Sequence, residues 1–347
     1  MTKSVQSVFQ INDPSLESQW RAIILFGKNS ATYKFAFARA LLDLVDKETT
    51  YVSLDDLAKP YSKYLVEHLK NNDKQGNSKS STFLNGCRSF INNEISEQDL
   101  FELTKRYGFA NVIDAFQNIG GGTIPDIFYE KDFSSSFKRL VITDNLLRLK
   151  ENFHFQNFHQ ETEARWNLVE TAWNLNINPN LLEVHYDNEL NELFIESDKD
   201  RRVNITSIRD ALNGYQKGKC FYSFQDISIN PNTDNICDVD HFIPLSLHPI
   251  FVDMGINING VWNLVLADSS INRNSKSSNL PAQKYLDRLH NRNEFYISSK
   301  HPLAETIINQ TGNTPKQRVN FLNHVYQKAL NKKIVTWKPD IELIGNF

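Results

Sequence analysis

The sequence predicts an α+β protein that is mainly helical, with a helical N-terminal region, a small unit of two strands and a helix, and a C-terminal helix. Three observations support this fold class. Apolar residues recur at helical spacing through roughly the first 130 residues. Two short apolar runs, around positions 239 and 265, are typical of strands. Thr314-Pro315 begins a final helical pattern that runs to about Leu330.

Helices of the N-terminal region are predicted from capping residues and from apolar residues spaced along one face. Asn12 to Ser15 and Asn29-Ser30 are candidate starts for the first two, and Ser53-Leu-Asp-Asp has capping-box character before the third. The expected helices run through residues 20–24, 33–44, 53–69, 83–91, 97–107 and 110–116. The tripeptide Gly120-Gly-Gly lacks the pattern of a phosphate-binding loop and predicts a turn.

We expect the chain to divide into four regions. Residues 1–130 form a helical domain, and residues 131–204 form a mixed α/β connecting region. A third domain spans residues 205–295 and contains the two predicted strands. Residues 296–347 form a C-terminal helical extension.

Elements of the later regions follow from the same rules. The sequence predicts strands at 138–143, 193–196 and 334–337 and helices at 161–174 and 205–215. Trp166 and Trp173 lie in one of these helices. We expect them to be core residues, because tryptophans are highly buried on average, rather than platforms for stacking bases.

Composition narrows the class of protein. Three cysteines in 347 residues, without framework spacing, favour a reducing compartment over a disulfide-bonded secreted protein. The first residues lack the apolar core of a signal peptide, and no run reaches the ~18 apolar residues that span a bilayer. We therefore expect a cytoplasmic protein with no membrane partner.

The formal net charge of −3 hides an uneven distribution of charged residues. Residues 183–200 carry seven acids against one lysine, whereas residues 201–219 carry five basic residues against one acid. Further basic residues recur at Arg273, Lys276, Lys284, Arg288 and Arg292. Because phosphate binding needs local positive charge, this pattern favours a nucleic-acid partner, with solvated helix faces as the alternative.

The most informative segment lies between residues 237 and 281. Asp240 and His241 end one apolar run, Asn263 opens another after 21 intervening residues, and Asn272 follows after eight more. Asp240 and Asn272 offer oxygen ligands, which suit Mg²⁺ or Mn²⁺. His241, with an ordinary pKa near 6.5, can take a proton from water at neutral pH. Asn263 can hold the loop and the imidazole by hydrogen bonds. Together these groups could hydrolyse a phosphodiester around one cation.

The same segment carries candidate phosphate ligands. Ser269 and Ser270 are N-cap-type residues, so a helix starting there would carry Asn272, Arg273 and Lys276. Arg273 and Lys276 would then meet phosphate oxygens, Lys276 as a point charge.

Two neighbouring residues have more than one interpretation. Asp238 either orients His241, belongs to the outer shell of the metal, or is a solvated turn acid. His248, in a Leu-His-Pro segment, is interpreted as a loop residue.

Together these residues resemble the HNH endonucleases, the ββα-metal nuclease family. The matching positions are Asp240, His241, Asn263 and Asn272, and the match covers roughly residues 215–292. The segment is similar to the HNH domain of RNA-guided nucleases and to free-standing bacterial HNH proteins, here with a long helical N-terminal region. The resemblance assigns the ββα-metal nuclease fold to the third predicted domain.

The resemblance also implies a reaction. His241 would activate the attacking water, and one divalent cation held by Asp240 and Asn272, Mg²⁺ before Mn²⁺, would stabilise the transition state. The implied substrate is DNA, double-stranded, and bacterial restriction or anti-phage defence is the implied setting. Because an ungated nuclease is toxic, we expect a partner protein or self-association to control it.

One departure from the family concerns zinc. Many HNH proteins pin the fold with a zinc knuckle of two Cys-x-x-Cys pairs, and a closed structural site needs four ligands. Here Cys220 stands at the first position but Ser223 at the second, and the other pair would fall at Asp268 and Ile271. We therefore expect no structural zinc, with apolar residues alone holding the domain.

Two rival functions stay open at this point. The protein could be a non-catalytic nucleic-acid-binding or scaffold subunit with a degenerate HNH site, or an RNA-directed nuclease. Metal-dependent nicking separates the first from an enzyme, and parallel assays on DNA and RNA separate the second.

Overall fold

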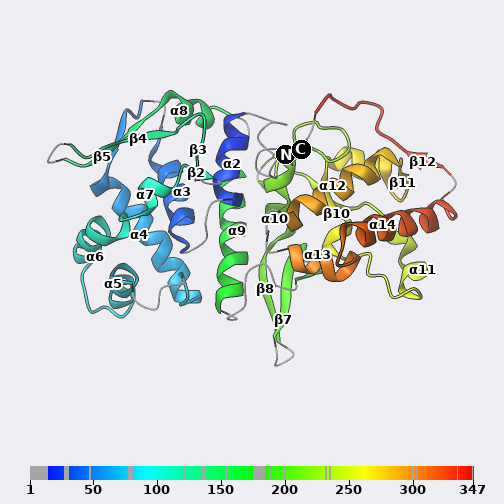
Figure 1. The fold of residues 1–347 in the computed structure, drawn as a ribbon, viewed down its shortest axis with the longest axis horizontal. Helices are drawn as coiled ribbons and strands as arrows, with labels where there is room; N and C mark the ends of the chain where they lie inside the picture. Colours follow the sequence, from blue (N-terminus) through cyan, green and yellow to red (C-terminus); the bar gives the residue numbers. More distant parts are fainter. Residues whose placement is uncertain are drawn as a thin grey trace. The chain divides into compact units, whose positions relative to one another are not determined.

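The computed structural model describes residues 15–26, 31–46, 48–76, 81–119, 122–134, 137–152, 155, 157–174, 184–187, 189–197, 201–230, 233, 236–298, 301, 303–333, 335–345 and 347. The chain divides into two compact units, within residues 6–176 and 177–347, which we call the N-terminal and C-terminal units (Figure 1). The boundary lies inside the predicted connecting region. Helices predominate and the sheets are small, which confirms the α+β, mainly helical class.

The N-terminal unit consists mostly of helices that begin at small polar residues. Ser15 accepts the backbone N–H of Ser18 near the start of α2, and Ser53 accepts that of Asp56 at the start of α4. The predicted start at Ser53 is confirmed, whereas residues 12–14 and 29–30 lie outside the described residues. The helices are α2 (Leu16–Phe26), α3 (Tyr33–Leu44), α4 (Leu54–Asn71), α5 (Thr82–Ile91), α6 (Glu97–Leu103), η1 (Thr104–Gly108), α7 (Val112–Ala115), α8 (Asp144–Lys150) and α9 (Asn157–Asn174).

Short antiparallel strands accompany these helices. The strands are β1 (Tyr51–Ser53), β5 (Arg139–Ile142) and β4 (Tyr129–Asp132), in that order in one sheet, and β2 (Asn118–Ile119) and β3 (Gly122–Thr123) in a hairpin. β5 confirms the strand predicted at 138–143. The turn predicted at Gly120 lies outside the described residues.

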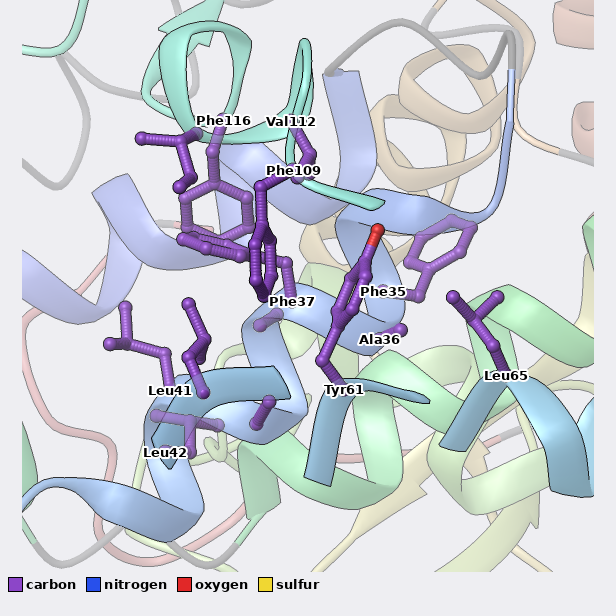
Figure 2. Packing of buried hydrophobic residues seen from close by; sticks show 14 of the residues in the cluster. Phe35, Ala36, Phe37, Leu41, Leu42, Tyr61, Leu65, Phe109, Val112 and Phe116 are labelled. Carbon is purple, nitrogen blue, oxygen red and sulfur yellow. The ribbon is translucent and has the colours of Figure 1, made fainter. Parts of the chain in front are cut away.

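Apolar residues at helical spacing form the core of the N-terminal unit. Phe37 and Leu41 on α3 and Tyr61 on α4 are fully buried, and Figure 2 shows them within one cluster. Residues four apart on a helix lie on the same face, so α3 turns this face towards α4. Trp166 and Trp173 of α9 belong to the same core, as predicted.

In the C-terminal unit, small sheets alternate with helices. Its sheets include β6 (His185–Asp187), β7 (Glu192–Ser197) and β8 (Arg201–Ser207), which are antiparallel in that order, and β11 (Leu280–Pro281), which is parallel to β12 (Thr336–Trp337). Its helices include α10 (Ile208–Gln216), α11 (His248–Val252), α12 (Lys284–Ser298), α13 (Ala304–Thr311) and α14 (Pro315–Leu330).

Sequence pattern predicted part of this unit correctly. β7 confirms the strand at 193–196, and Thr314 is the N-cap of α14, in a capping box that Gln317 completes. The helix predicted over 205–215 begins only at Ile208, because residues 201–207 pair with β7 as a strand. No helix in the described part of the chain has the length and apolar character needed to cross a bilayer.

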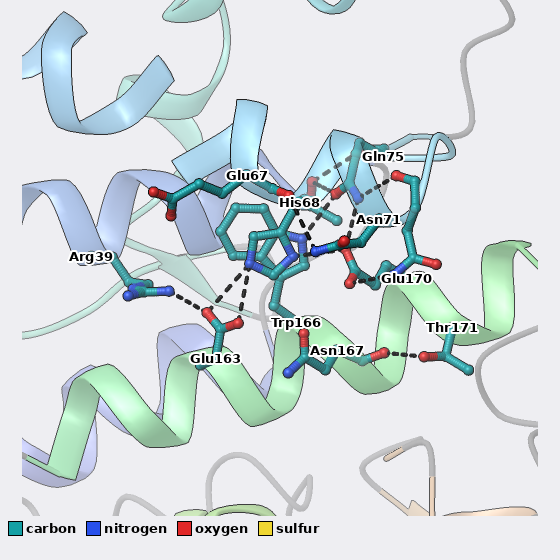
Figure 3. Close-up of polar contacts among 12 residues, drawn as sticks. Arg39, Glu67, His68, Asn71, Gln75, Glu163, Trp166, Asn167, Glu170 and Thr171 are labelled. Atoms are coloured by element: carbon teal, nitrogen blue, oxygen red, sulfur yellow. Dashed lines mark hydrogen bonds and ion pairs between the residues drawn. The ribbon is translucent and has the colours of Figure 1, made fainter. Parts of the chain in front are cut away.

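A buried polar cluster joins α4 to α9 in the N-terminal unit (Figure 3). The imidazole of His68 lies flat on the indole of Trp166, with ring centroids 3.5 Å apart. Its Nδ1 is 2.9 Å from Glu170 and its Nε2 is 3.2 Å from Glu163. Gln75 donates to Glu170 at 2.7 Å and accepts the indole N–H of Trp166 at 2.9 Å. These bonds supply the partners that buried polar groups need.

The protonation of His68 depends on this cluster. Burial lowers the pKa of His68, but hydrogen bonds and charge attraction from Glu163 and Glu170 outweigh burial and raise the pKa to about 9. The unfolded chain has the ordinary value near 6.5. Because the folded-state pKa is the higher one, the resulting stabilisation is complete below pH ~6.5 and is lost as the pH rises through about 9.

We expect His68→Gln to lower the free energy of unfolding more at pH 6 than at pH 9.5. The difference between wild type and variant should shrink by on the order of 3 kcal/mol across that range, since one pKa unit corresponds to about 1.4 kcal/mol. Urea unfolding at several pH values measures it, with His324→Gln on α14 as an exposed control. A difference that stays constant with pH would contradict the prediction.

Candidate functional site

A two-stranded hairpin carries the candidate site. β9 (Asp238–His241) pairs antiparallel with β10 (Leu264–Ala267), with His241 opposite Leu264 and Ala267 opposite Asp238. Every residue of β10 is buried, as expected for a continuous apolar run in a strand. Side chains alternate along a strand, so Asp238 and Asp240 lie on one face of the hairpin.

The helix that follows β10 begins differently from the prediction. It is a short π-helix, η5 (Ile271–Lys276), and Ser277 donates its N–H to the carbonyl of Asn272 five residues earlier. Ser269 and Ser270 are not its side-chain caps. Instead, the carboxylate of Asp268 accepts the N–H groups of Ser270 at 2.9 Å and of Ile271 at 3.1 Å. A carboxylate satisfies these N–H groups better than a hydroxyl because it is charged.

Polar side chains near the start of η5 contact an acid of β9. Arg273 donates two hydrogen bonds to Asp238, at 2.9 and 2.8 Å, and Asn272 donates one at 3.3 Å. Burial raises the pKa of Asp238, but these donors outweigh it and hold the pKa below its usual value. Asp238 is therefore an anchor for η5 rather than a solvated turn acid. The side chain of Arg273 remains 67% exposed.

The last residue of η5 contacts the other acid of the strand. Lys276 Nζ is 2.9 Å from Asp240 Oδ1 and 3.0 Å from the carbonyl oxygen of His241. The hydroxyl of Tyr222 donates to Asp240 Oδ2 at 2.5 Å. All of these side chains are buried, and that of Lys276 is only 1% exposed. Lys276, predicted as a phosphate ligand, therefore has its charge directed into the protein.

His241 is held at the end of β9 by a loop residue. Its Nε2 donates to Asn259 Oδ1 at 2.9 Å, and its ring lies 6.2 Å from that of Tyr186. Burial lowers the pKa of His241 and outweighs the attraction of Asp240, which raises it. The imidazole is thus neutral at pH 7. Donation by Nε2 places the lone pair of the neutral ring on Nδ1.

Asn263 fixes the loop that connects the two strands. Its Oδ1 accepts the N–H of Ile243 at 2.8 Å, and its Nδ2 donates to the carbonyls of Ile243 at 3.0 Å and Ile258 at 2.8 Å. Asn263 itself is fully buried. Because this loop carries Asn259, Asn263 also acts on the position of His241.

The fit of a divalent cation depends on both donor type and arrangement. Asp240, Asn272 and Asp238 offer the oxygen donors that a hard cation prefers. In the arrangement described, however, each oxygen of Asp240 has a donor, and the amide of Asn272 contacts Asp238. Among the described residues, no group of three or more His, Cys, Asp or Glu is placed to hold a metal ion. The residue types fit a metal, but this arrangement of them does not.

Several basic residues near the site in sequence have structural contacts. Arg292 is fully buried and donates to the carbonyls of Trp262 at 2.8 Å and Leu264 at 2.9 Å. Arg288 donates to Glu342 at 2.8 Å, and Lys284 forms an ion pair with the same carboxylate. These contacts hold α12, whereas Arg273, which pairs with Asp238, keeps a largely exposed side chain.

Two residues of the site carry no recognisable sequence signal. Tyr222 contacts Asp240 from 18 residues away, within a Cys-Phe-Tyr-Ser segment without a known motif. Asn259 precedes Asn263 by four positions in an Asn-rich loop, so its contact with His241 requires the folded loop. Only the tertiary structure brings both residues to the site.

Cys220 and Asp268, two of the four positions compared with a zinc knuckle in the sequence, are in contact. Cys220 Sγ accepts the N–H of Asp268 at 3.4 Å, so two of the four knuckle positions lie side by side. The absence of structural zinc stays a prediction. Comparisons of the chain with protein-family models, with curated proteins and with solved structures find no match.

We expect Asn263→Ala to lower the free energy of unfolding of the C-terminal unit by about 3 kcal/mol or more. The substitution leaves the N–H and carbonyl of Ile243 and the carbonyl of Ile258 buried without partners, and each unsatisfied group costs roughly 1–3 kcal/mol. Urea unfolding tests this. Asn320→Ala, on the exposed face of α14, is the control and should change stability by less than about 0.5 kcal/mol. Equal effects of the two substitutions would refute the role of Asn263.

Proposed function

We propose that the C-terminal unit is an HNH-type, ββα-metal nuclease domain that hydrolyses phosphodiester bonds in DNA. The observation that carries the proposal is the arrangement around one hairpin: Asp240 and His241 end β9, Asn263 closes the loop, and η5 lies over the acids. Two segments of the chain meet there, β9 and the run from Asn263 to η5, although 21 residues separate His241 from Asn263. The adjacent Cys220 and Asp268 add support from the knuckle positions.

In this proposal His241 is the general base. Its lowered pKa keeps the ring neutral near pH 7, and Asn259 holds Nε2, so Nδ1 is the nitrogen that accepts a proton from water. Asn263 is a positioning residue, because it fixes the loop that carries Asn259. The exposed guanidinium of Arg273 is available to a phosphate oxygen while its other edge holds Asp238.

Asp240 and Asn272 are the proposed ligands of one Mg²⁺ or Mn²⁺, once Asp240 is released from Lys276 and Asn272 from Asp238. When bound, the cation would stabilise negative charge on the phosphate and on the departing oxygen. The proposed substrate is double-stranded DNA. Restriction or anti-phage defence in bacteria is the proposed setting, with a partner protein or self-association controlling the activity.

A second candidate function has one specific observation in its favour. The buried ion pair of Lys276 with Asp240 is what a degenerate site would have if the domain only bound nucleic acid or served as a scaffold. The two functions differ in one measurable property, which is metal-dependent cleavage.

We expect the wild-type protein to nick or cut supercoiled plasmid with Mg²⁺ or Mn²⁺ and His241→Ala to lower the rate by at least 100-fold, the lower range for loss of a general base. His324→Ala, an exposed histidine on α14, is the matched control and should cut at the wild-type rate. Single-stranded DNA and RNA are assayed in parallel. Cleavage by His241→Ala at the wild-type rate would remove His241 as the base.

The same assay decides between the two functions. Binding of DNA by the wild-type protein without metal-dependent cleavage, in the presence or absence of a cellular partner fraction, would favour the binding or scaffold role.

A further inference from the structure

We propose that Lys276 is a built-in cation that occupies Asp240 and keeps a divalent metal ion out until η5 moves. This inference rests on the proposed nuclease function and concerns the control of the same site. Lys276 is the only cation that contacts Asp240 among the described residues, and its ammonium takes the position that a metal ligated by Oδ1 would need.

The contacts of Asp240 make this arrangement stable. Lys276 donates to Oδ1, Tyr222 donates to Oδ2, and both partners are buried with the carboxylate. Lys276 has a second acceptor in the carbonyl of His241, at 3.0 Å. Taking one partner out of a buried ion pair is costly because it leaves the other charge without compensation. A metal ion and the ammonium also repel each other, so they do not share this carboxylate.

The position of η5 explains why Asn272 does not reach Asp240 in this state. Asn272 contacts Asp238, two residues before Asp240 on the same strand face, which is a distance of about 6.6 Å along the strand. Asn272 and Lys276 are four residues apart on one helix. A shift of η5 that brings Asn272 towards Asp240 therefore has to carry Lys276 away from it. The ion pair and the proposed metal site exclude each other.

The end of η5 is where such a shift would begin. Ser277, directly after Lys276, has φ 46° and ψ −124°, a backbone conformation that residues with a Cβ rarely adopt. Its N–H is bonded to the carbonyl of Asn272 at 2.7 Å, so the two ends of η5 are coupled. A strained conformation persists only where surrounding contacts hold it, and the adjacent ion pair of Lys276 with Asp240 is one such contact. The helix end is thus the proposed starting point of the shift.

The test measures binding of Mn²⁺ to the full chain by electron paramagnetic resonance. We expect wild type to bind Mn²⁺ at Asp240 weakly. Lys276→Met, which removes the charge and keeps the length of the side chain, should bind one Mn²⁺ at least tenfold more tightly. Asp240→Asn added to Lys276→Met should abolish the gain. Lys284→Met, which breaks the exposed ion pair with Glu342, is the matched control and should bind as wild type does.

A second substitution at Lys276 keeps the test valid if Lys276→Met does not fold. Lys276→Gln is neutral but still donates a hydrogen bond, so it should fold and also bind Mn²⁺ more tightly, with an Mn²⁺-dependent rise in melting temperature that wild type lacks. Tight stoichiometric binding by wild type, equal to that of either Lys276 variant, would overturn the inference. So would a Lys276→Gln protein that is folded but gains no affinity.

The outcome is separable from that of the nuclease proposal. If the Lys276 variants bind Mn²⁺ through Asp240 but do not cut DNA, the control by Lys276 stands and the nuclease function falls. If wild type binds Mn²⁺ tightly and cuts DNA, the nuclease function stands and the control by Lys276 falls.

Discussion

The candidate site depends on the buried ion pair between Asp240 and Lys276. It joins β9 to the last turn of η5, and the second hydrogen bond of Lys276 fixes the carbonyl of His241. Without Lys276, the carboxylate would keep only the hydroxyl of Tyr222 as a partner, and an uncompensated charge in the interior is costly. The pair therefore determines where η5 lies, and through η5 it determines which side chain faces each acid of the strand.

The N-terminal unit also contains acidic side chains that need partners, and a different set of groups supplies them. There the half-buried Glu163 and the buried Glu170 share the imidazole of His68, and the indole of Trp166 covers the ring. In the C-terminal unit the acids have separate cations, Arg273 and Lys276. The first arrangement is a single cluster that titrates with a raised pKa, whereas the second is a pair of contacts along one helix. Both arrangements give the acids charged partners.

Sequence reasoning predicted the elements of the site better than their contacts. The two strands and the following helix were expected where β9, β10 and η5 lie, because apolar runs and polar starts are local signals. The cap of η5 was assigned to serines, yet Asp268 supplies it, and the hydroxyls of Ser269 and Ser270 donate instead to the carbonyl of Ile236 and to Asp268. Lys276 was expected at a phosphate because the predicted helix would carry it to the site beside Arg273, whereas it is buried against an acid 36 residues earlier in the chain.

By itself, the sequence determined the helical periodicity of α3 and α4, the capping boxes and the apolar strands, because each of these depends on residues within a few positions of one another. The tertiary structure alone decided that Tyr222 and Lys276 share Asp240, that Asn259 holds His241, and that His68 lies between acids about a hundred residues away. Such pairings depend on how elements pack in space. The spacing of residues along a chain carries no information about that packing until the chain has folded.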